Sequence, residues 1–271
     1  MQYVTHPSSE YPIGVAVDGV IGANDGDLAI FHIVMSQLQA DKPSPNSICV
    51  DVGADKGWFS RLIVTANPQN PVVYAFEPNP QSYKELVEGL AADGKKSVYA
   101  FPIAISSQET TLDFVFDGPC SHSRGASGGQ QAERVFAKPL DAVIEAGRQI
   151  YFMKIDTEGH DLDVLESARG LIEAGCVRHI VFEYTAHWLG TQAEATATTR
   201  AALEKYMRTY KYIYALSRCG PSYLVGPLAA TEIDAFVGDH YTRRLQTDIY
   251  MTNMPPTDIP AFPFKAGAYY A

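Results

Sequence analysis

Short apolar runs alternate with amphipathic segments along the middle of the chain. The runs are rich in Val, Ile, Tyr and Phe, as buried strands are, and the segments between them carry apolar side chains at helical spacing. Asn79 followed by Pro80 is a typical helix start, and Gly94 is a typical helix end. The strand-like runs are 47–53, 72–76, 97–105, 111–116, 150–156 and 177–184, and the helical segments are 56–66, 80–93 and 161–174. This repetition predicts an α/β fold with a mostly parallel sheet and helices on both faces.

The two ends of the chain depart from this repetition. Residues 211–218 and 248–253 predict late strands that run antiparallel at one edge of the sheet. The tail after Pro255 is rich in Pro, Phe and Tyr, and it is a candidate surface for a homo-oligomer. The predicted parts are an N-terminal hairpin and helix extension (1–46), the main α/β domain (47–254) and a Pro/aromatic C-terminal tail (255–271).

Composition and charge narrow the class of protein. Of the 271 residues, 46% are apolar and 19% are charged, and the formal net charge is -10. No block of Lys and Arg is present, so neither nucleic acid nor an anionic membrane is an expected partner. No apolar run approaches the roughly 20 residues of a membrane span. The first ten residues lack a secretory signal and the four cysteines are widely spaced, which predicts reduced thiols in a cytoplasmic protein.

Two glycine-containing loops are candidates for a ligand site, VDVGADKG at 50–57 and GANDGD at 22–27. A nucleoside site needs a strand before the loop, a helix after it, and an acidic residue at the end of the next strand. The first loop meets all three conditions, because Glu77 ends the next strand and its carboxylate can accept hydrogen bonds from both ribose hydroxyls. The second loop lacks such an acid, and the favoured interpretation is a turn in which Asp25 or Asp27 caps a helix.

The residues of the first loop favour a cationic nucleoside over a dinucleotide. The G-x-G-x-x-G pattern of dinucleotide sites is absent, because Trp58 and Phe59 stand where a third glycine is needed. Asp51, at the strand end, has the wrong charge for a diphosphate and suits an amino group and a sulfonium, as in S-adenosylmethionine. Two alternatives stay open: a nicotinamide-dependent reductase on a similar sheet, and a non-catalytic nucleoside-binding domain.

The blocks VDVGADKGWFS, FEPNPQSYKEL, AISS, KIDTEGHDLDVLESA and VFEY together resemble the FkbM-type family of S-adenosylmethionine-dependent methyltransferases. The resemblance covers residues 47–185, and the KIDTEG block is its most specific part. It implies a class I methyltransferase (Rossmann-like) fold and O-methylation of a hydroxyl on a sugar, a glycan or a natural product. The chain departs from the family pattern at Asp55, where Asn is usual, and at His160, where Ala is frequent.

The resemblance also implies a set of residues around the cofactor. The loop after the first strand would line the methionine side, and Glu77 would hold the ribose with Asn79 near it. Residues 104–106 would border the adenine, and this segment holds no acidic residue to read the amino group of the base. The expected cofactor contacts are Asp51, Gly53, Ala54, Asp55, Gly57, Glu77, Asn79, Ala104, Ile105, Ser106 and Asp156.

The segment IDTEGHD is dense in groups that can hold a proton. It passes from a strand end into a helix, which places it at the carboxyl edge of the sheet, where open α/β folds bind ligands. Asp156 or His160 is a candidate base for the acceptor proton, and Glu158 is a candidate for orienting the acceptor or cofactor. Capping of the following helix is the alternative role for Glu158 and Asp161. Such groups also suit Mg²⁺ or Mn²⁺, but the cluster is common without an ion, and no metal is expected.

The acceptor is expected to be a hydroxyl of a small molecule or glycan. Glu183, Tyr184 and His187 follow the strand-like run 177–184 or end it, and they are candidates for contact with this acceptor. The Gly- and Ser-rich segment 117–131 is a candidate lid, with an ordinary exposed loop as the alternative.

Overall fold

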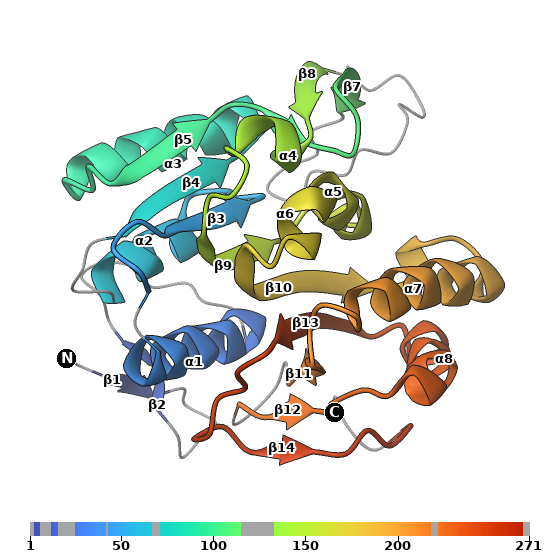
Figure 1. Ribbon diagram of the computed structural model, residues 1–271. Helices are drawn as coiled ribbons and strands as arrows, with labels where there is room; N and C mark the ends of the chain where they lie inside the picture. The colour runs from blue at the N-terminus through green and yellow to red at the C-terminus, as the bar shows by residue number, and fades with distance from the viewer. Residues whose placement is uncertain are drawn as a thin grey trace. The chain divides into compact units, whose positions relative to one another are not determined.

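The computed structural model describes residues 3–5, 12–15, 25–41, 43–66, 71–114, 133–217 and 222–267. The chain divides into two compact units. Figure 1 labels the helices and strands of both. The central unit comprises residues 44–178, and the terminal unit combines residues 1–43 with residues 179–271. The predicted segment 117–131 lies outside the described residues, as do residues 22–24 of the loop 22–27, whose residues 25–27 belong to the first helix.

The central unit is built on a parallel sheet with the strand order β9-β3-β4-β5. Its strands are β3 (Ile48–Val52), β4 (Val72–Phe76), β5 (Val98–Phe101) and β9 (Ile150–Ile155), and the helices α2 (Trp58–Ala66) and α3 (Pro80–Ala92) connect β3 to β4 and β4 to β5. Every residue of β3 and β9 is buried, as expected for strands covered on both faces. The carboxyl ends of these strands therefore meet at one edge of the sheet.

The start of α3 confirms the predicted helix cap. The side chain of Asn79 accepts hydrogen bonds from the backbone N–H groups of Gln81 at 2.9 Å and Ser82 at 3.3 Å. Pro80 occupies the first helical position, where its missing N–H leaves no donor unpaired. After the helix, Gly94 adopts a φ of 65°, so the left-handed residue that ends the helix is the glycine that the sequence indicated.

A second, three-stranded sheet and three short helices form the rest of the described part of the central unit. The sheet has the order β6-β8-β7, with β6 (Ala104–Ile105), β7 (Thr110–Phe114) and β8 (Glu133–Lys138), and the helices are α4 (Leu140–Val143), α5 (Asp161–Ser167) and α6 (Arg169–Glu173). The carboxylate of Asp141 accepts the N–H groups of Gly170 and Leu171, at 2.7 and 3.0 Å, and so ties α4 to α6.

Two predicted elements are divided in the structure. The run 97–105 forms two strands, β5 and β6, because Pro102 between them has no N–H for a sheet ladder. The helix expected over 161–174 is interrupted at Ala168. The hydroxyl of Ser167 donates a 2.6 Å hydrogen bond to the carbonyl of Val164 at this point, a local bond that competes with helix continuation.

The terminal unit contains a largely antiparallel sheet with the order β14-β12-β11-β13-β10. Its elements are β1 (Tyr3–Thr5), β2 (Pro12–Val15), α1 (Asp25–Ala40), β10 (Val177–Thr185, from His179 on), the 3₁₀ turn η1 (Ala186–Trp188), α7 (Gln192–Tyr206), β11 (Tyr212–Leu216), β12 (Leu224–Val225), the 3₁₀ turn η2 (Ala230–Glu232), α8 (Ile233–Arg243), β13 (Gln246–Thr252) and β14 (Ala261–Phe262). β13 pairs antiparallel with both β10 and β11, which confirms the two antiparallel late strands.

A buried polar network fixes α1 within the terminal unit. The side-chain amide of Gln37 donates to the hydroxyl of Tyr250 at 3.1 Å and to the carbonyl of Met254 at 2.7 Å. The same hydroxyl lies 2.9 Å from Nδ1 of His179 on β10. In the described part of the chain, no helix has both the length and the apolar character to cross a membrane.

Candidate cofactor site

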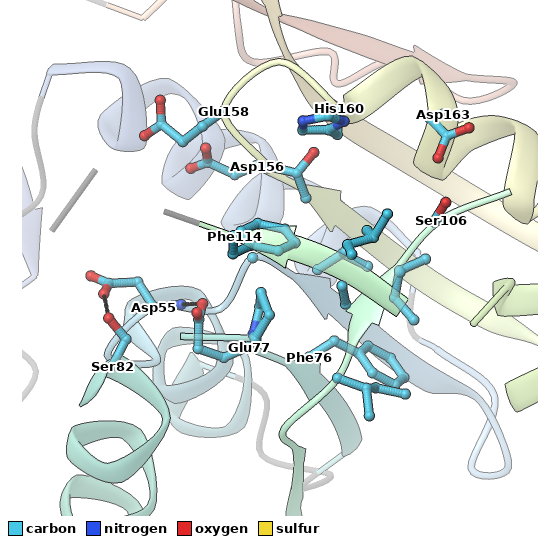
Figure 2. A pocket seen from close by; sticks show the side chains of 18 of the residues that line it. Asp55, Phe76, Glu77, Ser82, Ser106, Phe114, Asp156, Glu158, His160 and Asp163 are labelled. Atoms are coloured by element: carbon cyan, nitrogen blue, oxygen red, sulfur yellow. Dashed lines mark hydrogen bonds between the residues drawn. The ribbon is translucent and has the colours of Figure 1, made fainter. Parts of the chain in front are cut away.

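A pocket of about 520 Å³ opens at the carboxyl ends of β3, β4 and β9 in the central unit. This volume is typical of sites for small molecules and cofactors. Figure 2 shows Asp55 and Ser82 on one side of the pocket and Ser106 and Asp163 on the other, with Glu77 between them. Strands β6 and β7 add apolar walls. The lining is Val52, Gly53, Asp55, Phe76, Glu77, Pro78, Ser82, Ile103, Ala104, Ile105, Ser106, Leu112, Asp113, Phe114, Asp156, Thr157, Glu158, His160 and Asp163.

The loop after β3 needs glycine at two positions. Gly53 has a φ of 75°, and a Cβ atom there would stand 1.7 Å from the backbone oxygen of Asp156. Gly57 has a φ of 83°, and a Cβ atom there would stand 2.3 Å from Cδ1 of Leu86. Glycine therefore allows the loop after β3 to touch both the end of β9 and helix α3.

Glu77 lies at the end of β4 and holds this loop. Its Oε2 atom accepts the N–H of Asp55 at 2.8 Å, and its Oε1 atom accepts the N–H of Asn79 at 2.7 Å. Burial raises the pKa of Glu77 to about 7, although both hydrogen bonds act in the opposite direction. A carboxylate has about four acceptor sites, so these two bonds leave acceptor capacity that faces the pocket.

Asp55 is held in the loop by contacts of its backbone and its side chain. It adopts a φ of 43°, a left-handed conformation that Asp and Asn tolerate better than most residues. Its Oδ1 atom accepts a 2.7 Å hydrogen bond from the hydroxyl of Ser82 on α3. The Asp at this position thus keeps an acceptor oxygen at the pocket wall.

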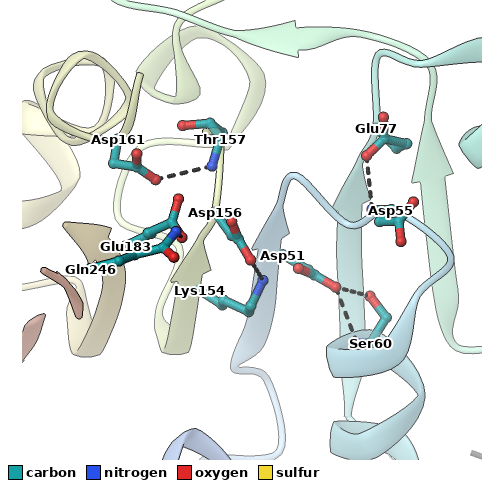
Figure 3. A network of polar contacts seen from close by, with 10 residues as sticks. All are labelled: Asp51, Asp55, Ser60, Glu77, Lys154, Asp156, Thr157, Asp161, Glu183 and Gln246. Atoms are coloured by element: carbon teal, nitrogen blue, oxygen red, sulfur yellow. Dashed lines mark hydrogen bonds and ion pairs between the residues drawn. The ribbon is translucent and has the colours of Figure 1, made fainter. Parts of the chain in front are cut away.

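Asp51 is buried and is not one of the residues that line the pocket. Its Oδ2 atom accepts the backbone N–H of Ser60 at 3.1 Å and the hydroxyl of Ser60 at 2.7 Å, which caps the first turn of α2 (Figure 3). Burial raises the pKa of Asp51, and the positive charge of Lys154 acts against that shift. Its predicted contact with a cationic cofactor stays a prediction.

Asp156 follows β9 and reaches the pocket wall. Its Oδ2 atom lies 2.9 Å from Nζ of Lys154, whose side chain is only 8% exposed while that of Asp156 is 37% exposed (Figure 3). Its backbone N–H donates to the carbonyl of Val52 at 2.9 Å, which places it at the end of β3. A carboxylate held in this way can face a ligand in the pocket.

The turn from Thr157 to His160 is organised by the buried carboxylate of Asp161. Its two oxygens accept the N–H groups of Thr157 at 3.0 Å and Gly159 at 3.1 Å. Burial, followed by the charge of Asp156, raises the pKa of Asp161 to about 7. Glu158 adopts a φ of 55° within this turn. His160 precedes α5 and lines the pocket, and burial lowers its pKa from the ordinary value.

Several lining residues did not stand out in the sequence. Asp163 on α5 accepts the N–H of Ser107 through Oδ2 at 3.0 Å, and so lies beside segment 104–106. Ser82 comes from α3, and Leu112 and Phe114 come from β7. For Asp163 a signal was present, because it stands two residues after Asp161 in the same acidic segment. For β7, the signal pointed only to a strand.

Comparison with models of protein families shows the family of the chain. The family model described as the methyltransferase FkbM domain matches residues 51–214. The chain belongs to the FkbM methyltransferase family. This confirms the resemblance seen in the sequence, and with it S-adenosylmethionine as the cofactor of the family. The parallel sheet of the central unit agrees with the class I methyltransferase fold that the resemblance implies.

The solved structures that this chain resembles are distant from it in sequence. A methyltransferase FkbM from Methylobacillus flagellatus KT is 17% identical, with a TM-score of 0.47, and the match covers 80% of this chain and 47% of that one. This chain therefore spans about half the length of that protein. The N-terminal domain of human METTL16 in complex with SAH is 10% identical, with a TM-score of 0.44 and coverage of 90% and 76%.

A third similar structure is Aeropyrum pernix fibrillarin with bound S-adenosyl-L-methionine. It is 11% identical, with a TM-score of 0.41 and coverage of 82% of this chain and 74% of that one. The comparison with curated proteins found no match for this chain.

The structure of this FkbM-family chain brings together most of the predicted site residues of the central unit. Nine of them line one pocket: Gly53, Asp55, Glu77, Ala104, Ile105, Ser106, Asp156, Glu158 and His160. Four do not line it: Asp51, Ala54, Gly57 and Asn79. These four support the loop and helix starts, and their direct contact with a cofactor stays a prediction.

The three predicted substrate residues belong to the terminal unit. Glu183 is 5% exposed and accepts a hydrogen bond from the amide of Gln246. Tyr184 is buried, its hydroxyl lies 2.9 Å from Oγ1 of Thr199, and its ring stacks on Phe236, a setting that favours packing. His187 lies in η1 beside Trp188, with ring centroids 6.0 Å apart. Contact of these three residues with an acceptor stays a prediction.

Proposed function

We propose that this chain is an S-adenosylmethionine-dependent methyltransferase that methylates a hydroxyl of a sugar, a glycan or a natural-product small molecule. The observation that carries the proposal is the acid-lined pocket at the carboxyl edge of the sheet, with Glu77 at the end of β4. A carboxylate at that position is suited to the two hydroxyls of a ribose.

The charge of the pocket favours a cationic cofactor. Among the described lining residues, the only basic side chain is His160, and no Lys or Arg is present. The carboxylates are Asp55, Glu77, Asp113, Asp156, Glu158 and Asp163. Such a lining attracts an amino group and a sulfonium and repels the diphosphate of a nicotinamide dinucleotide. This supports a methyltransferase over the alternative of a reductase.

The residues of the central unit suit different parts of the cofactor. Glu77 would hold the ribose, and Asp55 and the loop from Gly53 would face the methionine amino group. Segment 104–106 would border the adenine. When bound, the cofactor supplies a methyl group bonded to a positively charged sulfur. The neutral thioether that remains after the transfer is a good leaving group.

The protein must position the acceptor and remove one proton from its hydroxyl. The Asp156 carboxylate, oriented by Lys154, is placed at the pocket wall where it can accept that proton. Burial lowers the pKa of His160 below its ordinary value of 6.5, so a neutral imidazole is available at neutral pH as a second acceptor of the proton. Glu158, at the same wall, would orient the acceptor.

Calorimetric titration separates the proposal from its alternatives. S-adenosylhomocysteine, NADH and NADPH are titrated separately into the full chain. We expect S-adenosylhomocysteine to bind and both nicotinamide dinucleotides to give no heat. Binding of NADH or NADPH, with none of S-adenosylhomocysteine, would show that the assignment of the pocket is wrong.

The acceptor class is tested with radiolabelled S-adenosylmethionine. The full chain is incubated with panels of sugars, hydroxylated natural products, primary amines and RNA. We expect label in a hydroxylated compound, as a methyl ether. Label in the amines or the RNA alone would overturn the hydroxyl assignment. No label in any panel, despite tight binding of S-adenosylhomocysteine, would favour the non-catalytic nucleoside-binding domain.

A further inference from the structure

We propose that Asp163 recognises the exocyclic amino group of the adenine of the cofactor and so makes the pocket selective for an adenosyl group. This inference rests on the proposed function, because it assumes that a nucleoside occupies the pocket. The residue lies on α5, outside the segment that the family resemblance assigned to the adenine.

The carboxylate of Asp163 is fixed by one hydrogen bond and turned toward the pocket. Its Oδ2 atom accepts the backbone N–H of Ser107 at 3.0 Å, and the residue is one of those that line the cavity. Figure 2 shows Asp163 and Ser106 together on one side of the pocket. The Oδ1 atom of the carboxylate therefore remains available as an acceptor for a ligand.

The position of Glu77 divides the pocket into two ends. One end holds Asp55 and Ser82, which are polar and suit the amino acid part of the cofactor (Figure 2). The other end holds Asp163 and Ser106, and Figure 2 shows Phe114 between the two ends. Two strands of the smaller sheet and the segment before it line the pocket with apolar side chains, which are Ile103, Ala104, Ile105, Leu112 and Phe114. A flat purine fits an apolar wall with one acceptor at its edge.

The hydrogen-bond chemistry of the base gives the selectivity. Adenine carries an amino group that donates to a carboxylate, whereas hypoxanthine carries a carbonyl oxygen at the same position, which a carboxylate repels. A site built to pair with a donor rejects an analogue that lacks it. The Ser107 N–H also determines how an amide would sit in Asp163→Asn. The amide oxygen would accept from Ser107, so its NH₂ group would face the pocket and donate to a carbonyl.

The test compares S-adenosylhomocysteine with S-inosylhomocysteine by calorimetry on three forms of the full chain. These are the wild type, Asp163→Asn and the control Glu166→Gln, an exposed carboxylate on the same helix. We expect the wild type and the control to prefer the adenosyl compound at least tenfold. In Asp163→Asn we expect the adenosyl compound to bind at least tenfold more weakly and the inosyl compound to bind more tightly than in the wild type.

Each result decides between this inference and the proposed function. Equal affinity of the wild type for the two compounds would overturn the inference without any variant, even if Asp163→Asn failed to fold. A folded Asp163→Asn that kept the wild-type preference would overturn it as well. If the wild type bound neither compound, the proposed function itself would fail, and this inference with it.

Discussion

At the scale of single residues, the buried carboxylate of Glu77 has a structural role and, in the proposed function, a binding role as well. Its two oxygens already accept the N–H groups of Asp55 and Asn79, which orders the loop after β3 and the start of α3. The ribose hydroxyls of the proposed cofactor would use the remaining acceptor sites of the same group. Substitution at this residue should therefore affect cofactor binding strongly.

We expect Glu77→Gln to weaken the binding of S-adenosylhomocysteine at least tenfold. Hydrogen bonds to a charged group contribute about 1.5–3 kcal/mol, and the amide has only one acceptor atom. Calorimetry measures the change, and Glu88→Gln, on the exposed side of α3, is the control. An unchanged dissociation constant in a folded Glu77→Gln protein would contradict the assignment of the loop 53–57 to the cofactor.

At the scale of elements, the loop after β3 and the end of β9 meet at Gly53. The backbone of Asp156 lies where a side chain at Gly53 would be, so the contact of the two segments depends on the absence of a Cβ atom. The positions of Asp55 and Asp156 in the pocket follow from this contact. The sequence shows the glycine, but the atom that it avoids is more than a hundred residues away.

We expect Gly53→Ala to destabilise the protein far more than Gly147→Ala. The two glycines have similar φ angles, 75° and 80°, so the strain of a left-handed alanine is about 1–2 kcal/mol in both. A Cβ at Gly147 meets nothing within 4 Å, whereas the one at Gly53 would lie 1.7 Å from a backbone oxygen. Urea unfolding should show a loss above about 4 kcal/mol, or no folded protein, for Gly53→Ala alone. Equal losses would mean that the crowding at Gly53 is relieved at little cost.

Not every element was predicted from the sequence. Helix α7 begins at a capping box, in which the Thr191 hydroxyl accepts the N–H of Glu194 at 3.3 Å and the Glu194 carboxylate accepts the N–H of Thr191 at 2.7 Å. The residue types of this box are visible in the sequence, but the helix has a weak apolar stripe and was not expected. Strand β8 was missed because its burial depends on the small sheet that it forms with β6 and β7.

At the scale of the whole molecule, buried carboxyl groups link stability to pH. Burial raises the pKa of Glu77 from its ordinary value of 4.5 to about 7. A group whose pKa is higher in the folded state makes its full contribution to stability below its pKa in the unfolded state. For Glu77 this contribution is lost as the pH rises through about 7. Burial lowers the pKa of His240 to about 4, which acts in the opposite direction, but its effect is complete near the ordinary value of 6.5.

We therefore expect the free energy of unfolding of the cofactor-free protein to fall between pH 6 and pH 8 by about 1 kcal/mol more in the wild type than in Glu77→Gln. Urea unfolding at several pH values in this range measures the difference. Parallel curves for the two proteins would mean that Glu77 titrates at an ordinary pKa in the folded state.

The sequence by itself determined the strands β3, β4, β5 and β9 and the helices α2 and α3 of the central unit, the family, and the loop 53–57 with Glu77. These features depend on local patterns: apolar periodicity, a helix cap, a glycine and the spacing between two strand ends. Only the tertiary structure decided that Asp51 is buried and does not line the pocket, that Asp163 lines the pocket beside Ser106, and that β7 provides one of its walls. The reason is physical. Whether a side chain faces a cavity or the core depends on contacts between segments far apart in the chain, and a local pattern contains no information on those contacts.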